Sequence, residues 1–382
     1  MRSEGESLKS WLWRSELLPA LRSEPWLWGA AGALLLLGLM MTLNTTYFIS
    51  LSKTGTPFHL FKRQLLSIAL GLVAMLVLTR VPAAVLQTIA PYVFGLSVIL
   101  LLALWLPGFG VNKSGARRWL NLGRLTIEPS ELTKFAWVVF LADLLSRNEH
   151  RLCDFRRGFL PPLVIFSVLA AIVLSQPDFG ATVVLSLLLF AMSFTAGVPP
   201  KQLGVVGAGV SLLFAFQAWH KSYRLRRVLA FAHPWDLTRS AGFQLVQSLI
   251  ALGAGGKWGV GLGAGEQKMF YLPQAHTDFV FAIVGEELGL VGALAVVALF
   301  GTILVRGMRI ARNEPETFAS LLAVGMTALL ALQAVINMAV VTGLLPTKGL
   351  ALPFLSYGGS AMVVSLAALG VLLGLSQRAK VQ

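Results

Sequence analysis

The sequence predicts an all-α integral membrane protein with about ten transmembrane helices and a large extracytoplasmic loop between spans seven and eight. Of its 382 residues, 56% are hydrophobic and only 13% are charged, whereas about a quarter of an average soluble protein is charged. The mean hydropathy is +0.75. Apolar runs of about twenty residues, the length that crosses a bilayer as a helix, recur along the chain. Most of the chain is therefore expected inside the membrane.

The apolar runs divide the chain into two short tails and one membrane domain. Residues 1–26 are polar and mixed in charge, which indicates a cytoplasmic N-terminal tail. No small-residue cleavage site follows the first run, so we expect a retained span and not a signal peptide. The membrane domain covers 27–376, and 377–382 form a cytoplasmic C-terminal tail. The spans are expected at 27–48, 61–80, 84–106, 131–146, 159–175, 179–197, 202–219, 279–305, 318–343 and 354–376.

Charge predicts which side of the membrane each loop occupies. The net charge is +14, and cytoplasmic termini place 15 Lys and Arg inside against 16 outside. The positive-inside rule discounts long loops. Setting aside 12 charges in the connections 107–130 and 220–278 and at Lys134 leaves 4 outside. The long loops are then external and unusually basic, which favours either anionic lipid headgroups or an anionic substrate.

The stretch "NKSGARRWLNLGRLTIEPSELTKF" is amphipathic and carries Arg117 and Arg118. At its end, Glu131 and Lys134 are spaced as i,i+3 neighbours on one helical face. One interpretation is an interfacial helix followed by a structural ion pair. The other is a polar wall of a cavity, because ionisable groups within a membrane segment are costly.

Asp178, in "SQPDFGAT", lies at the tight outer turn between the fifth and sixth spans. The simplest prediction is that it caps the following helix or forms an Asp turn.

The long loop 220–278 has local order of its own. "FQLVQSLIAL" has helical spacing and places Gln247 near one face. The stretch "GAGGKWGVGLGAGE" is not a nucleotide-binding loop, because Trp258 follows Lys257 where a Walker motif needs Ser or Thr, and no βαβ unit surrounds it. We expect a closely packed loop at the membrane surface, because irregular backbone is tolerated there only when it lines protein or water.

Lys348 lies between the last two apolar spans, and "SYGGS" follows it, with Ser356 and Ser360 at its ends. The glycine pair could leave backbone N–H groups free to bind an anion. The alternative is a helix kink packed through small residues.

Asp278 is the only carboxylate of "AHTDF", at the start of the eighth span, beside His276 and Thr277. An N-cap would explain Asp278 alone. Glu286 lies eight residues along the helix, roughly 12 Å away, which exceeds the roughly 5–9.5 Å of a paired glycosidase. We therefore expect Glu286 and Glu287 to bond to polar groups within the bundle.

In this order, "GARRWLNLG", "PSELTK", "QPDFG", "FQLVQSLIALGAGGKWGVGLG", "YLPQAHTDFVFAIVGEELG" and "LPTKGLALPFLSYGGS" resemble the SEDS family of FtsW, RodA and SpoVE. "PTKG" and "YLPQAHTDF" look most like the cell-division, FtsW branch. The resemblance implies a ten-span peptidoglycan glycosyltransferase that polymerises lipid II at the outer face of the bacterial inner membrane, at the division septum. It implies a class B penicillin-binding protein, FtsI-like, and other divisome membrane proteins as partners. No nucleic acid partner is expected.

The family's catalytic aspartate matches Asp278, and its functional lysines match Lys134 and Lys348. We expect Asp278 to act as general base and basic residues to stabilise the pyrophosphate leaving group, with Arg226 and Arg227 as further candidates. No cofactor is required, and a divalent cation (Mg or Mn) could share the work. The single cysteine, Cys153, excludes a cysteine-ligated metal site. The expected substrate-binding residues are Lys348, Lys134, Glu131, Arg118, Arg117, His276, Thr277, Gln247, Ser356 and Ser360.

Two other classes of function use the same features. A transporter that flips lipid II would need the same basic cavity, but the sequence shows no internal repeat and its best acid lies at the outer end of a span. A scaffold that only recruits a transpeptidase would tolerate loss of Asp278. An elongation or sporulation member of the family is the remaining alternative.

Overall fold

Helices occupy all ten segments that the sequence predicts to be spans. The structure is a computed structural model, and it describes residues 24–113, 116–123, 125–220, 230–232, 234–237 and 242–378. The predicted tails lie almost wholly outside these residues. The helices are α3 (Pro25–Thr54), α4 (His59–Arg80), α5 (Ala83–Ala103), α6 (Pro129–Arg147), α7 (Leu160–Ser175), α8 (Phe179–Ala196), α9 (Pro200–His220), α12 (Val280–Asn313), α13 (Thr317–Val341) and α14 (Gly359–Arg378). A shorter helix, α11 (Phe243–Gly255), confirms the helical spacing in the long loop.

Among the described residues, eight of the ten long helices are long and apolar enough to cross a membrane. The other two are α6 and α9. Helix α6 carries Glu131, Lys134 and Asp143, all of them buried within the protein. The all-α membrane fold is confirmed, whereas a count of ten spans stays a prediction.

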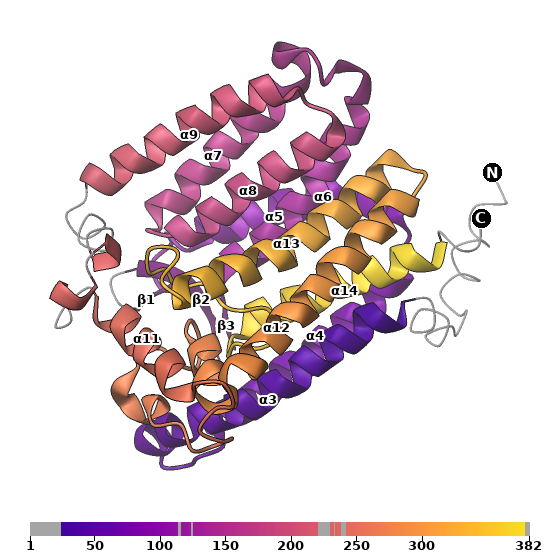
Figure 1. The fold of residues 1–382 in the computed structure, drawn as a ribbon. Coiled ribbons are helices and arrows are strands. Elements are labelled where there is room, and N and C mark those ends of the chain that lie inside the picture. The colour runs from indigo at the N-terminus through magenta and orange to yellow at the C-terminus, as the bar shows by residue number, and fades with distance from the viewer. Residues whose placement is uncertain are drawn as a thin grey trace.

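The bundle has α13 near its centre, in contact with α6, α8 and α12. Figure 1 shows α7, α8 and α9 to one side of it and α3, α4 and α14 to the other. Glycines allow α4 and α14 to approach closely, since a Cβ at Gly370 would lie 2.4 Å from the carbonyl oxygen of Met75. Helix α3 begins and α14 ends at the same end of the bundle (Figure 1), as an even number of spans requires.

The connection after α5 is a small antiparallel sheet of order β1-β2-β3, and the interfacial helix considered for this stretch is wrong. Its strands are β1 (Gly110–Lys113), β2 (Ala116–Leu122) and β3 (Leu125–Ile127). Leu120 pairs with Gly110 on one side and Ile127 on the other. The reversal between β2 and β3 passes through Gly123, whose φ of 78° suits glycine. A helix cannot continue through such a turn. The sheet lies at the end of the helix bundle opposite to the end where α3 begins (Figure 1).

Three helix boundaries differ from the sequence prediction by five residues or more, and the first is the end of α3, which lies at Thr54 and not near 48. Helix α12 runs eight residues past the predicted 305, with a break at Gly289, where φ is 65°. Helix α14 begins at Gly359 and not near 354. The preceding backbone cannot be helical, because the Tyr357 N–H donates to the His276 carbonyl at 2.9 Å. The "SYG" of this motif is therefore a loop joined to the segment before α12 and its "GS" begins α14, so a kink within a helix is the wrong description of it.

Candidate active site

Asp278 is presented by a tight turn just before α12. Gln274 occupies the left-handed region with φ of 58°. Its carbonyl oxygen accepts the N–H groups of Thr277 and Asp278 at 3.2 and 3.1 Å. Phe279 holds the cap position of α12 and no side chain caps this helix, so the N-cap interpretation of Asp278 is wrong. The turn thus presents a half-buried carboxylate that is not at the cap position of the helix.

Asn337 of α13 fixes the position of Asp278 from the other side. Its Nδ2 donates to the Asp278 carbonyl at 2.8 Å and to the Leu350 carbonyl at 2.6 Å. The Asp278 side chain lies against the backbone of Gly349, where a Cβ would come within 2.5 Å of Oδ2. Asp278 is thus held directly beside the segment that carries Lys348.

Lys348 is half-buried, and its ammonium lies 4.0 Å from the centroid of the Phe179 ring. Such a cation–π contact is favourable when the cation is partly desolvated. Gly180 makes room for the lysine stem, because a Cβ there would lie 3.0 Å from Lys348 Cε. The first two residues of α8, Phe179 and Gly180, therefore pack against the Lys348 side chain.

His276 and Thr277 connect the Asp278 turn to the loop before α14. Ser356 is buried, and its hydroxyl donates to the Thr277 carbonyl and accepts from the Leu352 N–H. Burial lowers the pKa of His276 to about 4, and Lys53 adds repulsion. His276 is therefore a neutral imidazole at pH 7.

The side chain of Gln64 on α4 hydrogen-bonds to the backbone of the "SYGGS" motif at Ser356 and Gly358. Its Oε1 accepts the Gly358 N–H at 3.2 Å, and its Nε2 donates to the Ser356 carbonyl at 3.3 Å. The N–H of Gly358 is thus already used within the protein. Anion binding by the glycine pair stays a prediction, and it cannot use the Gly358 N–H while Gln64 accepts from it.

Asp178 caps α8, as predicted, by accepting the Ala181 N–H at 3.2 Å. It also faces Arg118 of β2, whose guanidinium lies 3.8 Å from the carboxylate and donates to the Pro177 carbonyl. The sheet thereby brings a basic side chain to the turn that begins α8.

The pair formed by Glu131 and Lys134 is buried at the start of α6, with 2.7 Å between Oε1 and Nζ. The Lys134 side chain is only 1% exposed. Glu128, which the sequence analysis missed, lies just before them, and its N–H donates to the hydroxyl of Ser360 at 2.9 Å. Burial raises the pKa of Glu128 to about 8, and the Glu131 and Asp178 carboxylates add to the shift. Glu128 is therefore mostly protonated at neutral pH.

These contacts bring together segments that are far apart in the sequence: the starts of α6 and α8, the turn before α12 and the loop before α14. Two predicted residues lie outside this cluster of contacts. Arg117 is exposed on β2, and Gln247 is half-buried on α11. Arg226 and Arg227 lie outside the described residues. The residues that the sequence analysis missed are Glu128, Gln64, Asn337, Gly180 and Gly349.

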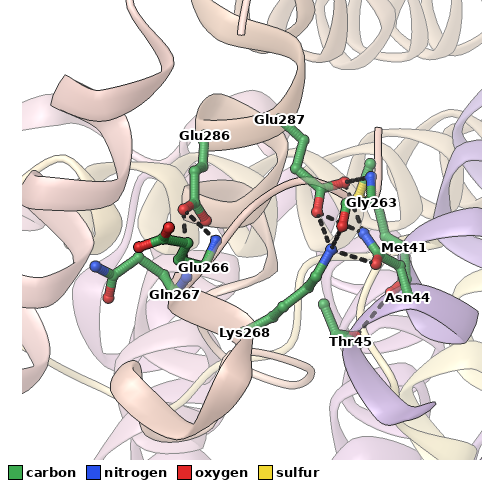
Figure 2. A network of polar contacts seen from close by, with 9 residues as sticks. All are labelled: Met41, Asn44, Thr45, Gly263, Glu266, Gln267, Lys268, Glu286 and Glu287. Carbon is green, nitrogen blue, oxygen red and sulfur yellow. Dashed lines mark hydrogen bonds and ion pairs between the residues drawn. The ribbon is translucent and has the colours of Figure 1, made fainter. Parts of the chain in front are cut away.

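Glu286 and Glu287 bond within the bundle, as predicted. Glu287 accepts from Asn44 of α3 at 2.6 Å, and Glu286 accepts the Glu266 N–H at 2.8 Å (Figure 2). Both carboxylates are thus bonded to other groups of the bundle, and Asp278 is the single carboxylate of its turn.

Fold and site together define a polytopic membrane protein with an acidic and basic cluster at one end of its helix bundle. The chain belongs to the FtsW/RodA/SpoVE family, described as cell cycle protein, which it matches over residues 25–381.

Relatives and solved structures of this family cover nearly the whole chain. It is 42% identical over 351 residues to a probable peptidoglycan glycosyltransferase FtsW of Geobacter sulfurreducens, covering 92% of this chain and 94% of that one. It is 43% identical over 354 residues to the FtsW of Legionella pneumophila, covering 92% and 90%. A chain from a peptidoglycan synthase complex that coordinates polymerisation and crosslinking superposes with a TM-score of 0.76 at 28% identity, covering 92% and 97%. The RodA of Thermus thermophilus superposes with a TM-score of 0.66 at 28% identity, covering 93% and 97%.

Proposed function

We propose that the protein is a peptidoglycan glycosyltransferase that polymerises lipid II into glycan strands for septal synthesis in cell division. The observation that carries the proposal is the held carboxylate of Asp278 beside Lys348, in a chain 42–43% identical to curated FtsW proteins over nine tenths of its length. The reaction belongs at the outer face of the inner membrane, with both termini cytoplasmic. The long loops 107–130 and 220–278 are rich in Lys and Arg, and a diphosphate substrate at the outer face would be attracted to these basic loops.

The partner follows from the same relatives. A class B penicillin-binding protein, FtsI-like, would crosslink the strands that this protein makes, and other divisome membrane proteins would recruit both. Similarity to a chain of a synthase complex supports a crosslinking partner.

In the mechanism, the 4-hydroxyl of the acceptor sugar attacks the anomeric carbon of the donor. Asp278 takes the hydroxyl proton as general base, a role typically worth 10²–10⁴-fold in rate. The bond from the anomeric carbon to undecaprenyl pyrophosphate breaks, and one displacement inverts that carbon. Pyrophosphate leaves as an anion and needs no proton, so one carboxylate suffices.

Basic side chains stabilise the negative charge of the leaving group as it develops. Lys348 is the first candidate, because it is half-buried next to Gly349, which touches Asp278. Arg118 is the second, with a side chain 30% exposed. Lys134 is almost wholly buried and bonded to Glu131, so it acts by holding Glu131 in place. His276, Thr277, Ser356 and Ser360 shape the turn and the loop around Asp278.

A divalent cation fits this site only as an ion shared with the substrate. Among the described residues, no group of three His, Cys, Asp or Glu side chains could hold a metal. Mg²⁺ commonly binds through one or two carboxylates together with substrate phosphates, and Asp278 would be the protein ligand. Such an ion would neutralise the pyrophosphate charge.

The test is polymerisation of purified lipid II by the protein with its transpeptidase partner. Asp278→Asn keeps the shape and removes the base, and Asp236→Asn, an exposed acid in the same loop, is the matched control. We expect glycan strands from wild type and the control and none from folded Asp278→Asn. Normal polymerisation by Asp278→Asn would disprove the mechanism. Movement of lipid II across vesicles without polymerisation by wild type would favour the transporter.

A further inference from the structure

A second buried lysine–glutamate pair, Lys268 with Glu287, lies where the long loop meets α12 (Figure 2). The ammonium of Lys268 donates to Glu287 Oε1, to Asn44 Oδ1 and to the Gly263 carbonyl, each at 2.6 Å. The side chains of Lys268 and Glu287 are 1% and 0% exposed. All three donors of this lysine are therefore used.

The carboxylates of α12 hold the loop backbone as well. Glu287 Oε2 accepts the Gly263 N–H at 3.0 Å, and both Glu287 oxygens lie 2.6 Å from Asn44 Nδ2. Glu286 Oε1 accepts the N–H groups of Glu266 and Gln267 at 2.8 and 3.2 Å. Together the two carboxylates accept three backbone N–H groups within the loop segment 263–267 and thereby hold that segment against α12.

The break in α12 completes this attachment. Because Gly289 leaves helical geometry, the carbonyls of Glu286 and Glu287 are free to accept the N–H groups of Val260 and Gly261 at 3.0 and 3.1 Å. Gly259 has φ of 81°, and a Cβ there would lie 2.1 Å from the Glu287 carbonyl oxygen. The glycine-rich stretch is thus a closely packed strap against α12.

The attachment controls the loop that carries Asp278. Lys268 and Glu287 are 19 residues apart, and Asp278 lies between them, so the ion pair closes a loop around the proposed base. We infer that Lys268, Glu287 and Asn44 form a latch that positions Asp278 for catalysis. The inference rests on the proposed function. These are positioning residues, because they act through the backbone of 269–277 and do not touch the reacting groups.

The latch also depends on α3. Asn44 ties the loop to a helix 224 residues away in the sequence, so the turn is fixed from both α3 and α12. A shift of about 1 Å at a reacting group can cost about 10²-fold in rate. Loosening one end of a nineteen-residue loop is sufficient for such a shift.

The test removes both charges, because a single substitution would leave one charge buried and unpaired. In Lys268→Met with Glu287→Gln, no charge remains and the volumes are similar. The matched control is Arg306→Met with Glu24→Gln, which removes another ion pair between α12 and the start of α3. Each full-length protein is assayed with the transpeptidase partner for lipid II polymerisation, and kcat and KM are normalised to the folded protein recovered in detergent.

We expect the latch variant to lose at least tenfold in kcat with KM within twofold, and the control to keep both. A purely structural role would lower the yield of folded protein and leave kcat of the folded fraction unchanged, which would overturn the inference. If the double variant is not recovered folded, Asn44→Ala, which keeps the ion pair, is judged by the same criterion, with a threefold loss of kcat expected. A wild type that does not polymerise lipid II would instead refute the proposed function.

Discussion

A single methyl group at Gly349 tests whether the placement of Asp278 matters. In Gly349→Ala the new Cβ would lie 2.5 Å from Asp278 Oδ2 and 3.2 Å from Cγ. Ordinary contact begins at 3.4 Å, so the oxygen must move by about 0.9 Å. The φ of Gly349 lies outside the left-handed range, so alanine fits the backbone, and the end of the Asp278 side chain is the part that yields.

The size of the effect follows from that displacement. A misplacement of about 1 Å can cost about 10²-fold in rate, so we expect kcat to fall by about 10–100-fold with little change in thermal stability. The assay is the initial rate of lipid II polymerisation by the purified protein with its partner. Gly253→Ala is the control, because nothing lies within 4 Å of a Cβ there. If Gly349→Ala polymerises within twofold of wild type while Gly253→Ala does the same, the position of the Asp278 carboxylate does not limit the rate and our reasoning fails.

Three further predictions concern the neighbouring groups. Because the pKa of Glu128 rises to about 8 on folding, the free energy of unfolding should decline from pH 5 to 8, where the carboxyl group of the unfolded chain ionises first. Melting temperatures measured across this pH range should show the decline in wild type and lose it in Glu128→Gln. The pKa of His276 falls to about 4, so stability should decline as pH drops from about 6.5 to 4, and His276→Gln should flatten this limb; an unchanged limb would show that His276 is not its source. Gly180→Ala would push on Lys348 Cε, 3.0 Å from the new Cβ, and should raise KM for lipid II several-fold in steady-state kinetics, whereas an unchanged KM would mean that Lys348 does not bind substrate.

The sequence was sufficient for the features that depend on local composition. Apolar length predicts where the helices lie, because each span needs its own twenty apolar residues. Asp278, Lys348 and Glu131 could be found because each is a charge next to or inside an apolar run. The cap at Asp178 follows from a local turn signal.

The features that were missed depend on distant partners or on a turn. The β2–β3 hairpin rests on one glycine in a stretch whose alternation is weak, so its amphipathic character was compatible with a helix. Glu128 has an ordinary sequence context, and its perturbed pKa arises from burial against residues of α6 and α8. Nothing local to Asn44 or Lys268 indicates that they meet, since 224 residues separate them.

The two buried lysine–glutamate pairs differ in a way that bears on their roles. In the latch, both oxygens of Glu287 and all three donors of Lys268 are bonded, so these buried charges are satisfied within the protein and none of their polar atoms is left for a substrate. In the pair on α6, Glu131 Oε2 is buried without a partner among the described residues. Buried polar groups are nearly always bonded, so an exception needs a cause. An unbonded acceptor of this kind suits a hydroxyl group of the proposed sugar substrate, which can donate to it, and not the diphosphate, which offers no donor. Glu131→Gln should therefore alter substrate affinity, whereas Lys268→Met with Glu287→Gln should alter turnover.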